Sequence, residues 1–275
     1  MSGLWRRVAL CLSLSVAVNA HAAEGAKTLR VCADPNNLPF SNERGEGFEN
    51  RLAEIVAREL GRKLEYTWWA QRRGFFRNTL NAGRCDLVMG VPSGFEMALT
   101  TQPYYRSSYA LVYRENAGYA PRSLDDPQLR TLRIGLHFIG DDYSNPPPAE
   151  ALARRGIVRN VVGYSLYGDY RESNPPARLI EAVARREVDV AIAWGPLAGY
   201  FAKRQPVELV VVPLPTPREA RAQPFEFSIA IGVRKGNEPL QAALDKVLVR
   251  KRNEVAGLLE EYGVPLVDTA VAYGQ

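Results

Sequence analysis

The chain has few of the residues from which metal sites and catalytic centres are commonly built. Its 275 residues include three cysteines and two histidines, and Cys11 and His21 fall in an N-terminal segment that we expect to be removed. The remaining His137 has no companion at ligand or triad spacing, so an ordinary polar contact is expected. G-x-S-x-G, H-E-x-x-H and phosphate-loop motifs are absent. The sequence therefore predicts no metal site, no bound cofactor and no enzyme activity.

Long apolar runs are equally scarce, and the longest marks the beginning of the chain. Arg6-Arg7 precede the apolar run Val8–Val18, and Ala20-His21-Ala22 has the A-x-A pattern of a cleavage site. This is the layout of a secretory signal peptide, and the run is too short to span a membrane. We expect cleavage after about Ala22, export of the mature chain, and no membrane span in it.

A strong excess of one charge is also missing. Lysine and arginine number 35 against 30 acidic residues, which gives a net charge of +5. The basic residues occur singly or in short groups among acids, as on solvated helix faces, so no nucleic-acid partner is predicted. A weakly basic surface could still steer an acidic protein partner.

Cys32 and Cys85 are the cysteines that remain after processing. In an oxidising compartment two such residues favour a disulfide, and two thiols cannot build a zinc site alone. Closing the loop between them would stabilise the fold by about 4 kcal/mol on the chain-entropy model.

Strands and helices alternate along the chain, which favours an α/β fold with mostly parallel sheets. In the first part, the expected elements are strand Leu29–Ala33, helix Phe48–Leu60, strand Leu64–Trp69, a second helix into which Gln71–Arg77 leads and which ends near Gly83, and strand Cys85–Gly90. In the second part, we expect helix Ala149–Arg155, strand Val161–Val162, helix Pro176–Arg186 and strand Glu208–Val212.

Two short sequences recur at one offset. Leu132–Ile134 repeats the pattern of Leu29–Val31, and Asp189–Ile192 repeats that of Asp86–Met89, each 103 residues later. A shared offset favours two lobes of similar plan.

The two lobes are expected to be joined by two long strands, Tyr109–Arg114 and Phe225–Val233, which would form a hinge. The final helices, Pro239–Tyr262, are expected to return to the first lobe. The predicted organisation is a signal peptide (1–22), the first part of lobe 1 (23–114), lobe 2 (115–224) and the return to lobe 1 (225–275).

Loops that follow the strands should line the cleft between the lobes, because ligands bind at the carboxyl ends of parallel strands. The predicted contact residues are Asp34, Asn36, Phe40, Trp68, Arg72, Arg73, Ser93, Tyr104 and Tyr105 in lobe 1, and Asp141, Asp142, Tyr143, Tyr167, Tyr170 and Trp194 in lobe 2. Their aromatic rings and carboxylates could grip a ligand or a partner's loop. The alternative is that half of these residues only pack against the edges of the lobes and contact no ligand or partner. The pair Asp141-Asp142 is more typical of a loop or helix cap than of a metal site or general acid.

Four segments resemble the two-lobed, type II periplasmic solute-binding proteins. They are the opening strand, loop and helix (29–48), Asp86–Gly90, Pro103–Tyr105 and Phe227–Gly236. Amino-acid binders of this fold carry T-x-E-R after the strand that corresponds to Asp86–Gly90. They also carry an Asp near the end of a strand in the second lobe. Here the corresponding segments are Val91–Glu96, without arginine, and Trp194–Pro196, without aspartate. The resemblance therefore implies the fold but not the amino-acid clamp.

A more specific resemblance is to the J proteins associated with quinoprotein methanol dehydrogenases, of the MxaJ and XoxJ types. It is carried by Cys32–Asn42, Trp69–Asn78, Ile139–Tyr143, Gly163–Tyr170 and Ala191–Phe201. This resemblance implies a periplasmic accessory protein that engages the dehydrogenase, more specifically the lanthanide type, or its c-type cytochrome acceptor. Pyrroloquinoline quinone and calcium or a lanthanide would belong to the partner.

Two alternatives remain at this point. The chain could be the receptor of an ABC transporter for a small ligand other than an amino acid. It could also be an enzyme on this fold, such as a dehydratase or hydrolase, which would need a cleft carboxylate with a raised pKa.

Overall fold

The computed structural model describes residues 27–138, 145–166, 170–217 and 223–267. Its strands are β1 (Thr28–Ala33), β2 (Asn36–Asn37), β3 (Ser41–Asn42), β4 (Lys63–Trp68), β5 (Leu87–Pro92), β6 (Leu99–Thr100), β7 (Tyr105–Arg114), β8 (Ile134–Phe138), β9 (Val161–Ser165), β10 (Val190–Trp194), β11 (Leu209–Pro213) and β12 (Glu226–Val233). Its helices are α1 (Phe48–Glu59), α2 (Phe75–Asn78), α3 (Pro147–Arg154), α4 (Arg178–Ala184), α5 (Gly195–Ala202), α6 (Glu238–Arg250) and α7 (Arg252–Glu261), with 3-10 turns η1 (Pro127–Arg130) and η2 (Pro175–Ala177).

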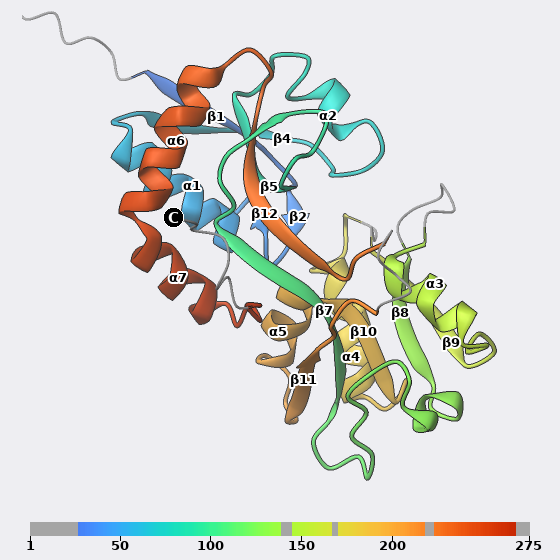
Figure 1. Ribbon diagram of the computed structural model, residues 1–275. Helices are drawn as coiled ribbons and strands as arrows, with labels where there is room; N and C mark the ends of the chain where they lie inside the picture. Colours follow the sequence, from blue (N-terminus) through green and yellow to red (C-terminus); the bar gives the residue numbers. More distant parts are fainter. Residues whose placement is uncertain (1–26, 139–144, 167–169, 218–222, 268–275) are drawn as a thin grey trace, which may run out of the picture.

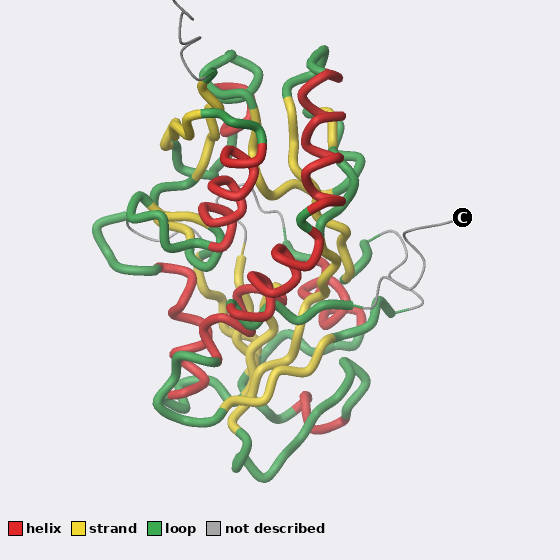
Figure 2. The backbone as a smooth tube through the Cα atoms, turned by 90° about the vertical axis from the view of Figure 1, so that its left-hand side faces the viewer, coloured by secondary structure: helices red, strands yellow, loops and turns green. Residues whose placement is uncertain are grey.

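The two lobes repeat one arrangement of parallel strands. In the first lobe β1 lies between β4 and β5, and in the second lobe β8 lies between β9 and β10. Helices flank the strands in both lobes (Figure 2). The predicted two-lobed α/β fold with mostly parallel sheets is therefore confirmed.

Strand β7 connects the lobes. Its first part, Tyr105–Ser108, pairs with β12 in the first lobe, and its second part, Tyr109–Arg114, pairs with β10 and β11 in the second. Figure 1 shows β7 running from one lobe into the other with β12 beside it. This is the expected two-strand hinge; the exact lobe boundaries at residues 114 and 224 stay predictions.

An ion pair recurs in both lobes at the offset seen in the sequence. Arg30 donates from Nη2 to Asp86 Oδ1 (2.7 Å) and from its backbone N–H to Oδ2 (3.0 Å). Arg133 makes the same two bonds to Asp189, at 2.9 and 2.8 Å. In each lobe the pair ties the start of one strand to the turn before its neighbour, so the repeated sequence is a repeated structural unit.

Cys32 and Cys85 form the expected disulfide, with their Cα atoms 5.5 Å apart. Both are buried in a small apolar cluster with Phe75 and Leu80. At the equivalent place in the second lobe, a Cβ atom on Gly135 would lie 3.2 Å from Val188 Cγ2. The second lobe therefore fills by side-chain packing the space that the disulfide occupies in the first.

One helix is much shorter than predicted. The helix expected to end near Gly83 is reduced to α2, because Gly74 before it has a left-handed φ of 87° and the Thr79 hydroxyl after it donates to the Phe75 carbonyl (2.6 Å). The prediction of a helix reaching Gly83 was wrong. Helix α5 was not predicted, since it is buried on all sides and lacks the polar face that periodicity detects.

The two C-terminal helices lie beside the first helix of the chain. Helices α6 and α7 pack against α1, where Arg58 pairs with Glu254 (2.7 Å) and Lys251 with Glu59 (3.0 Å). The end of α7 also reaches the second lobe, because the Tyr262 ring stacks on that of Tyr200 in α5. In the described ranges no helix combines the length and apolarity needed to cross a membrane.

Candidate functional site

Asp34, directly after β1, joins the two lobes at their cleft. Its buried carboxylate accepts the backbone N–H of Asn36 at Oδ1 (2.8 Å), and at Oδ2 it accepts the backbone N–H of Gln71 (2.6 Å) and the hydroxyl of Tyr170 (2.7 Å). Tyr170 belongs to the second lobe, so one carboxylate ties both lobes together. With three donors already bound, Asp34 acts as a structural anchor rather than as a free acid or base.

Two further contacts cross the cleft beside Asp34. Asn36 Nδ2 donates to the Glu172 carbonyl (2.8 Å), and the Arg72 guanidinium lies over the Tyr170 ring, 4.9 Å from its centroid. Burial, with a further contribution from Asp34, raises the pKa of Tyr170, so its phenol stays protonated as a donor at neutral pH. We call Asp34, Asn36, Arg72, Tyr170 and Glu172 the inter-lobe bridge.

Replacing Tyr170 with phenylalanine should weaken this bridge. The variant leaves Asp34 Oδ2 with one donor in place of two, and we expect a loss of about 1–2 kcal/mol in the free energy of unfolding. Urea unfolding measures the loss, and small-angle scattering should show a larger radius of gyration as the lobes separate. Tyr164→Phe, on β9, removes a phenol from the same lobe outside the bridge and is the control. Equal behaviour of the two variants would contradict the bridging role.

A cavity of about 370 Å³ lies between the lobes. We call it the inter-lobe cavity. Its walls are almost entirely apolar and aromatic and contain no charged side chain among the described residues. They are formed by Asn37, Phe40, Gln71, Pro92, Tyr109, Leu136, His137, Pro146, Leu166, Ile192, Trp194, Leu197, Phe227 and Ile229.

Trp194, at the end of β10, is the centre of the aromatic wall. Its ring meets those of Tyr109 and Phe227 edge to face, at centroid distances of 5.6 and 5.7 Å. Two of these rings come from the hinge strands β7 and β12, and the third comes from β10, which pairs with β7. A movement of the lobes therefore changes the shape of the cavity. The indole also hydrogen-bonds Tyr105, which links this wall to the core of the first lobe.

A second, polar cavity of about 460 Å³ lies at the rim and shares Asn36, Tyr170 and Glu172 with the bridge. We call it the rim groove. It is lined by Pro35, Asn36, Asn42, Glu43, Arg44, Tyr170, Arg171, Glu172, Ser173 and Asn174. The cleft thus has an apolar interior and a polar, partly charged rim.

The structure brings some of the predicted contact residues together and separates others. Phe40 and Trp194 line the inter-lobe cavity, while Asp34, Asn36, Arg72 and Tyr170 form the bridge. The remaining described ones lie elsewhere: Trp68 stacks on Tyr66, Tyr104 donates to the Met89 carbonyl, Tyr105 is buried against Phe48, and Arg73 and Ser93 are exposed. Asp141, Asp142, Tyr143 and Tyr167 lie outside the described residues.

The apolar walls of the cavity were not predicted. Leu136, Ile192 and Ile229 sit in strands that the sequence did indicate, yet an apolar strand residue reads the same whether it faces a core or a cavity. A usable signal was that β8 and β10 each end beside a predicted cleft loop.

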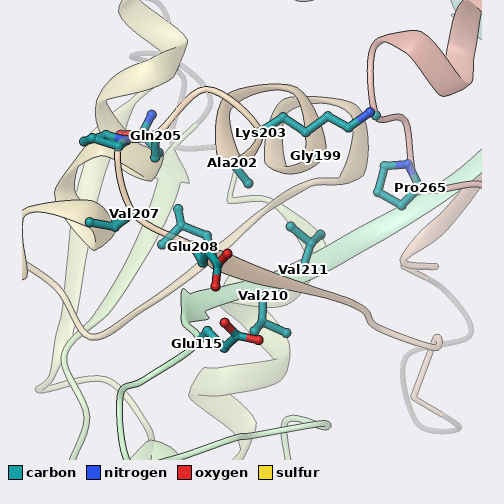
Figure 3. A pocket seen from close by; sticks show the side chains of 13 residues that line it. Glu115, Gly199, Ala202, Lys203, Gln205, Val207, Glu208, Val210, Val211 and Pro265 are labelled. Atoms are coloured by element: carbon teal, nitrogen blue, oxygen red, sulfur yellow. The ribbon is translucent and has the colours of Figure 1, made fainter.

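A third cavity, of about 670 Å³, lies outside the cleft. It is built from α5, β11 and the segment after α7 and shares no lining residue with the inter-lobe cavity. Figure 3 shows the carboxylates of Glu115 and Glu208 close to each other in it, and their hydrogen bond raises the pKa of Glu115. Across the described ranges, no three His, Cys, Asp or Glu side chains form a group that could hold a metal ion.

The fold and the cleft agree with a comparison of the sequence with protein families. Residues 29–264 match the bacterial extracellular solute-binding proteins, family 3. The chain belongs to this family. Among its relatives is the protein MoxJ of Methylorubrum extorquens, which is 30% identical over 262 residues, covering 90% of this chain and 85% of MoxJ.

Two solved structures of family relatives are similar over nearly the whole described chain. The periplasmic binding protein XoxJ from Methylobacterium extorquens AM1 is 37% identical, with a TM-score of 0.72, and covers 88% of this chain and 100% of its own. MxaJ from Methlophaga aminisulfidivorans MPT is 26% identical, with a TM-score of 0.74, and covers 87% and 100%. This solute-binding protein is therefore similar to the XoxJ and MxaJ types, as its motifs indicated.

Proposed function

We propose that the chain is a non-enzymatic periplasmic accessory of methanol oxidation. In this proposal it engages a pyrroloquinoline quinone-dependent methanol dehydrogenase, or the c-type cytochrome that accepts its electrons, through the inter-lobe cleft. The observation that carries the proposal is the chemistry of that cleft, whose described residues give it a polar rim and an interior without a charged side chain. The similarity to MoxJ, XoxJ and MxaJ supports the link to methanol oxidation.

The cleft does not suit the amino acids that this fold commonly binds. A bound amino acid brings a carboxylate and an ammonium, and each buried charge costs several kcal/mol unless a counter-charge receives it. The described walls of the inter-lobe cavity offer no such counter-charge. The bridge moreover holds the lobes together through protein groups alone, so closure here does not depend on a charged ligand.

The rim groove is the part of the cleft best suited to a protein partner. Arg44 and Glu43 place charged side chains at its edge, and the Arg44 side chain is 67% exposed. Charges at the rim of an interface steer association and fix orientation. In this proposal the dehydrogenase is of the lanthanide type, which rests on the resemblance of the sequence motifs; the identity is also higher to XoxJ than to MxaJ.

Co-purification from methanol-grown cells tests the proposal. The tagged chain should recover a quinoprotein dehydrogenase or a c-type cytochrome, and Arg44→Glu should reduce the recovery several-fold because it reverses a charge at the rim groove. Arg159→Glu makes the same charge change at an exposed site outside the groove and should leave recovery unchanged. Recovery of neither partner, or equal effects of both variants, would contradict the proposal.

Export belongs to the same proposal. The Arg6-Arg7 start, the apolar run and the Ala20-His21-Ala22 site support removal of residues 1–22. The intact mass of the protein from the periplasmic fraction should correspond to a chain that begins at Ala23. A mass that retains Met1–Ala22 would contradict export by this route.

A transporter receptor is the second candidate. The observation that favours it is the inter-lobe cavity itself, which is large enough for a small molecule. It predicts that one solute other than an amino acid raises the melting temperature with increasing concentration, since a ligand stabilises the state that binds it. Genes for transporter permease and ATPase subunits beside this one would support it over the accessory role.

A further inference from the structure

Strand β11 is an edge strand of the second lobe. Among the described residues it pairs with β7 alone, in antiparallel orientation. Just before the strand, the Glu115 N–H donates to the Glu208 carbonyl (3.1 Å), which sets the phase of the ladder. Alternate residues of an antiparallel strand bond the same neighbour, so the N–H and carbonyl groups of Leu209 and Val211 point away from β7.

This edge lacks the usual protection. Edge strands are commonly blocked by charged side chains, proline or a covering element. The edge strand β4 of the first lobe carries Lys63 and Glu65, which are exposed and pair with each other (2.9 Å). Strand β11 reads Leu-Val-Val-Val-Pro, without a charge and with its proline last. Across the described ranges, no group outside the sheet bonds the backbone of Leu209 or Val211.

The third cavity, of about 670 Å³, follows this edge, and we call it the β11 groove. Figure 3 shows that its lining lies on both sides of the strand, with Val211 and Pro265 on the side of α5, and Glu115 and Val210 on the other. A strand added along the edge would extend the sheet into this space. Its successive side chains would alternate between the two sides.

One side of the β11 groove carries an uncompensated negative charge. The carboxylates of Glu115 and Glu208 lie close together, both residues are exposed, and their hydrogen bond raises the pKa of Glu115. In the described part of the chain no cationic side chain pairs with either glutamate. Lys203, which also lines the groove, donates to the Glu260 carbonyl (3.1 Å) instead. Two carboxylates without a counter-charge attract a cationic group.

We propose that the β11 groove binds an extended, basic segment of a partner protein, which adds to β11 as an antiparallel strand. The backbone of the segment bonds Leu209 and Val211, and its small apolar side chains lie against Val211 and Pro265. A lysine or arginine of the segment lies opposite Glu208 and is shared with Glu115. The site lies outside the inter-lobe cleft and does not depend on which partner the cleft engages.

A second copy of this chain fits the β11 groove less well than a basic partner. Strand β11 has no basic side chain, so pairing two copies of it would bring no counter-charge to Glu115 and Glu208. Pro213 also offers no N–H to a facing strand. The charge of the groove therefore favours a partner segment that supplies a lysine or arginine.

Amide exchange measured by NMR on the exported protein tests the proposal. The probe is the peptide acetyl-Thr-Val-Thr-Val-Lys-Thr-amide, whose valines face Val211 and Leu209 when its lysine faces Glu208. In the free protein we expect slow exchange at Val210 and Val212, which bond β7, and faster exchange at Leu209 and Val211. The peptide should slow exchange at Leu209 and Val211 several-fold. The same peptide with N-methyl groups on both valines cannot make these backbone bonds and should have no effect.

The charge is tested by exchanging the lysine of the peptide for glutamine. This change should weaken binding about threefold, as for an exposed ion pair. Replacing Glu115 and Glu208 together with glutamine should abolish the preference for the lysine peptide. The control variant, Glu54→Gln with Glu96→Gln, removes two exposed carboxylates outside the groove and should retain it.

Four results would each overturn the proposal. They are unchanged exchange at Leu209 and Val211 with the lysine peptide, equal binding of the N-methylated peptide, and equal lysine preference in the two double variants. The fourth is a dimer in sedimentation whose Leu209 and Val211 amides are already protected without peptide, which would assign the edge to a second copy of the chain.

Discussion

Replacing Cys32 and Cys85 with alanine is expected to lower the free energy of unfolding by about 4 kcal/mol. The disulfide closes a loop with a sequence separation of 53 residues, and opening it restores that loop's conformational freedom to the unfolded chain. At about 2–4 °C per kcal/mol for a chain of this size, the melting temperature should fall by roughly 8–16 °C. Urea unfolding and calorimetry measure the two quantities.

The single variants provide the control for this prediction. Either Cys32→Ala or Cys85→Ala opens the bond, so each should lose nearly as much as the double variant rather than half of it. Reduction of the unaltered protein should bring its melting temperature to that of the variants. An unchanged melting temperature in the double variant would show that the bond does not restrict the unfolded chain.

Replacing Glu49 with glutamine is expected to stabilise the protein above pH 7. Glu49 lies in the first turn of α1, with its carboxyl group against Gly90 and facing Tyr104 and Tyr105. Burial raises its pKa from 4.5 to about 8. The folded chain therefore keeps a proton that the unfolded chain releases above pH 4.5, so the free energy of unfolding falls as the pH rises from about 4.5 to 8.

The size of this effect follows from the same burial. The full pKa difference corresponds to about 5 kcal/mol, but Glu49 keeps some contact with solvent, and we expect roughly 2 kcal/mol between pH 5 and 8. Glutamine mimics the protonated side chain, so Glu49→Gln should remove this decline and be more stable by a similar amount at pH 8–9. Urea unfolding across this pH range measures it.

Two comparisons distinguish the contribution of Glu49 to the pH dependence of stability from the contributions of other groups. Glu54→Gln changes an exposed carboxylate in the same helix and should leave the pH profile unaltered. His137 acts in the opposite sense: its pKa is lowered from 6.5 to about 4, so its contribution makes stability rise with pH in that interval. Above pH 7 the His137 contribution is constant, and a decline that persists there in Glu49→Gln would contradict the assignment.

The features that could be predicted from the sequence are those encoded locally or by a repeat. The strand before Asp34 and the amphipathic pattern of α1 each lie in one short segment. The offset of 103 residues between Arg30 and Arg133 indicated two lobes. Removal of the signal peptide takes Cys11 with it, so Cys85 was the one cysteine left to pair with Cys32. Each of these inferences needs only residues that are neighbours in the sequence, or one matching segment elsewhere in the chain.

The features that could not be predicted depend on distant parts of the chain. Asp34 was expected to contact a ligand or partner, but its oxygens are taken by Gln71 and Tyr170, which lie 37 and 136 residues away. The inter-lobe cavity was hidden for a related reason, because Leu136 and Ile229 look like core residues in the sequence. Residue type indicates that a side chain is buried. Whether that side chain packs in a core or lines a cavity depends on how the two lobes pack against each other.

Hydrogen–deuterium exchange of the chain with purified methanol dehydrogenase, and separately with its cytochrome, tests the proposed accessory role most directly. One of these partners should slow exchange in residues 34–44 and 170–174, which contain the rim groove and all of the bridge except Arg72, and should leave α6 and the outer face of α7 unchanged. Unaltered exchange with both partners, or protection confined to α6 and α7, would contradict engagement through the cleft.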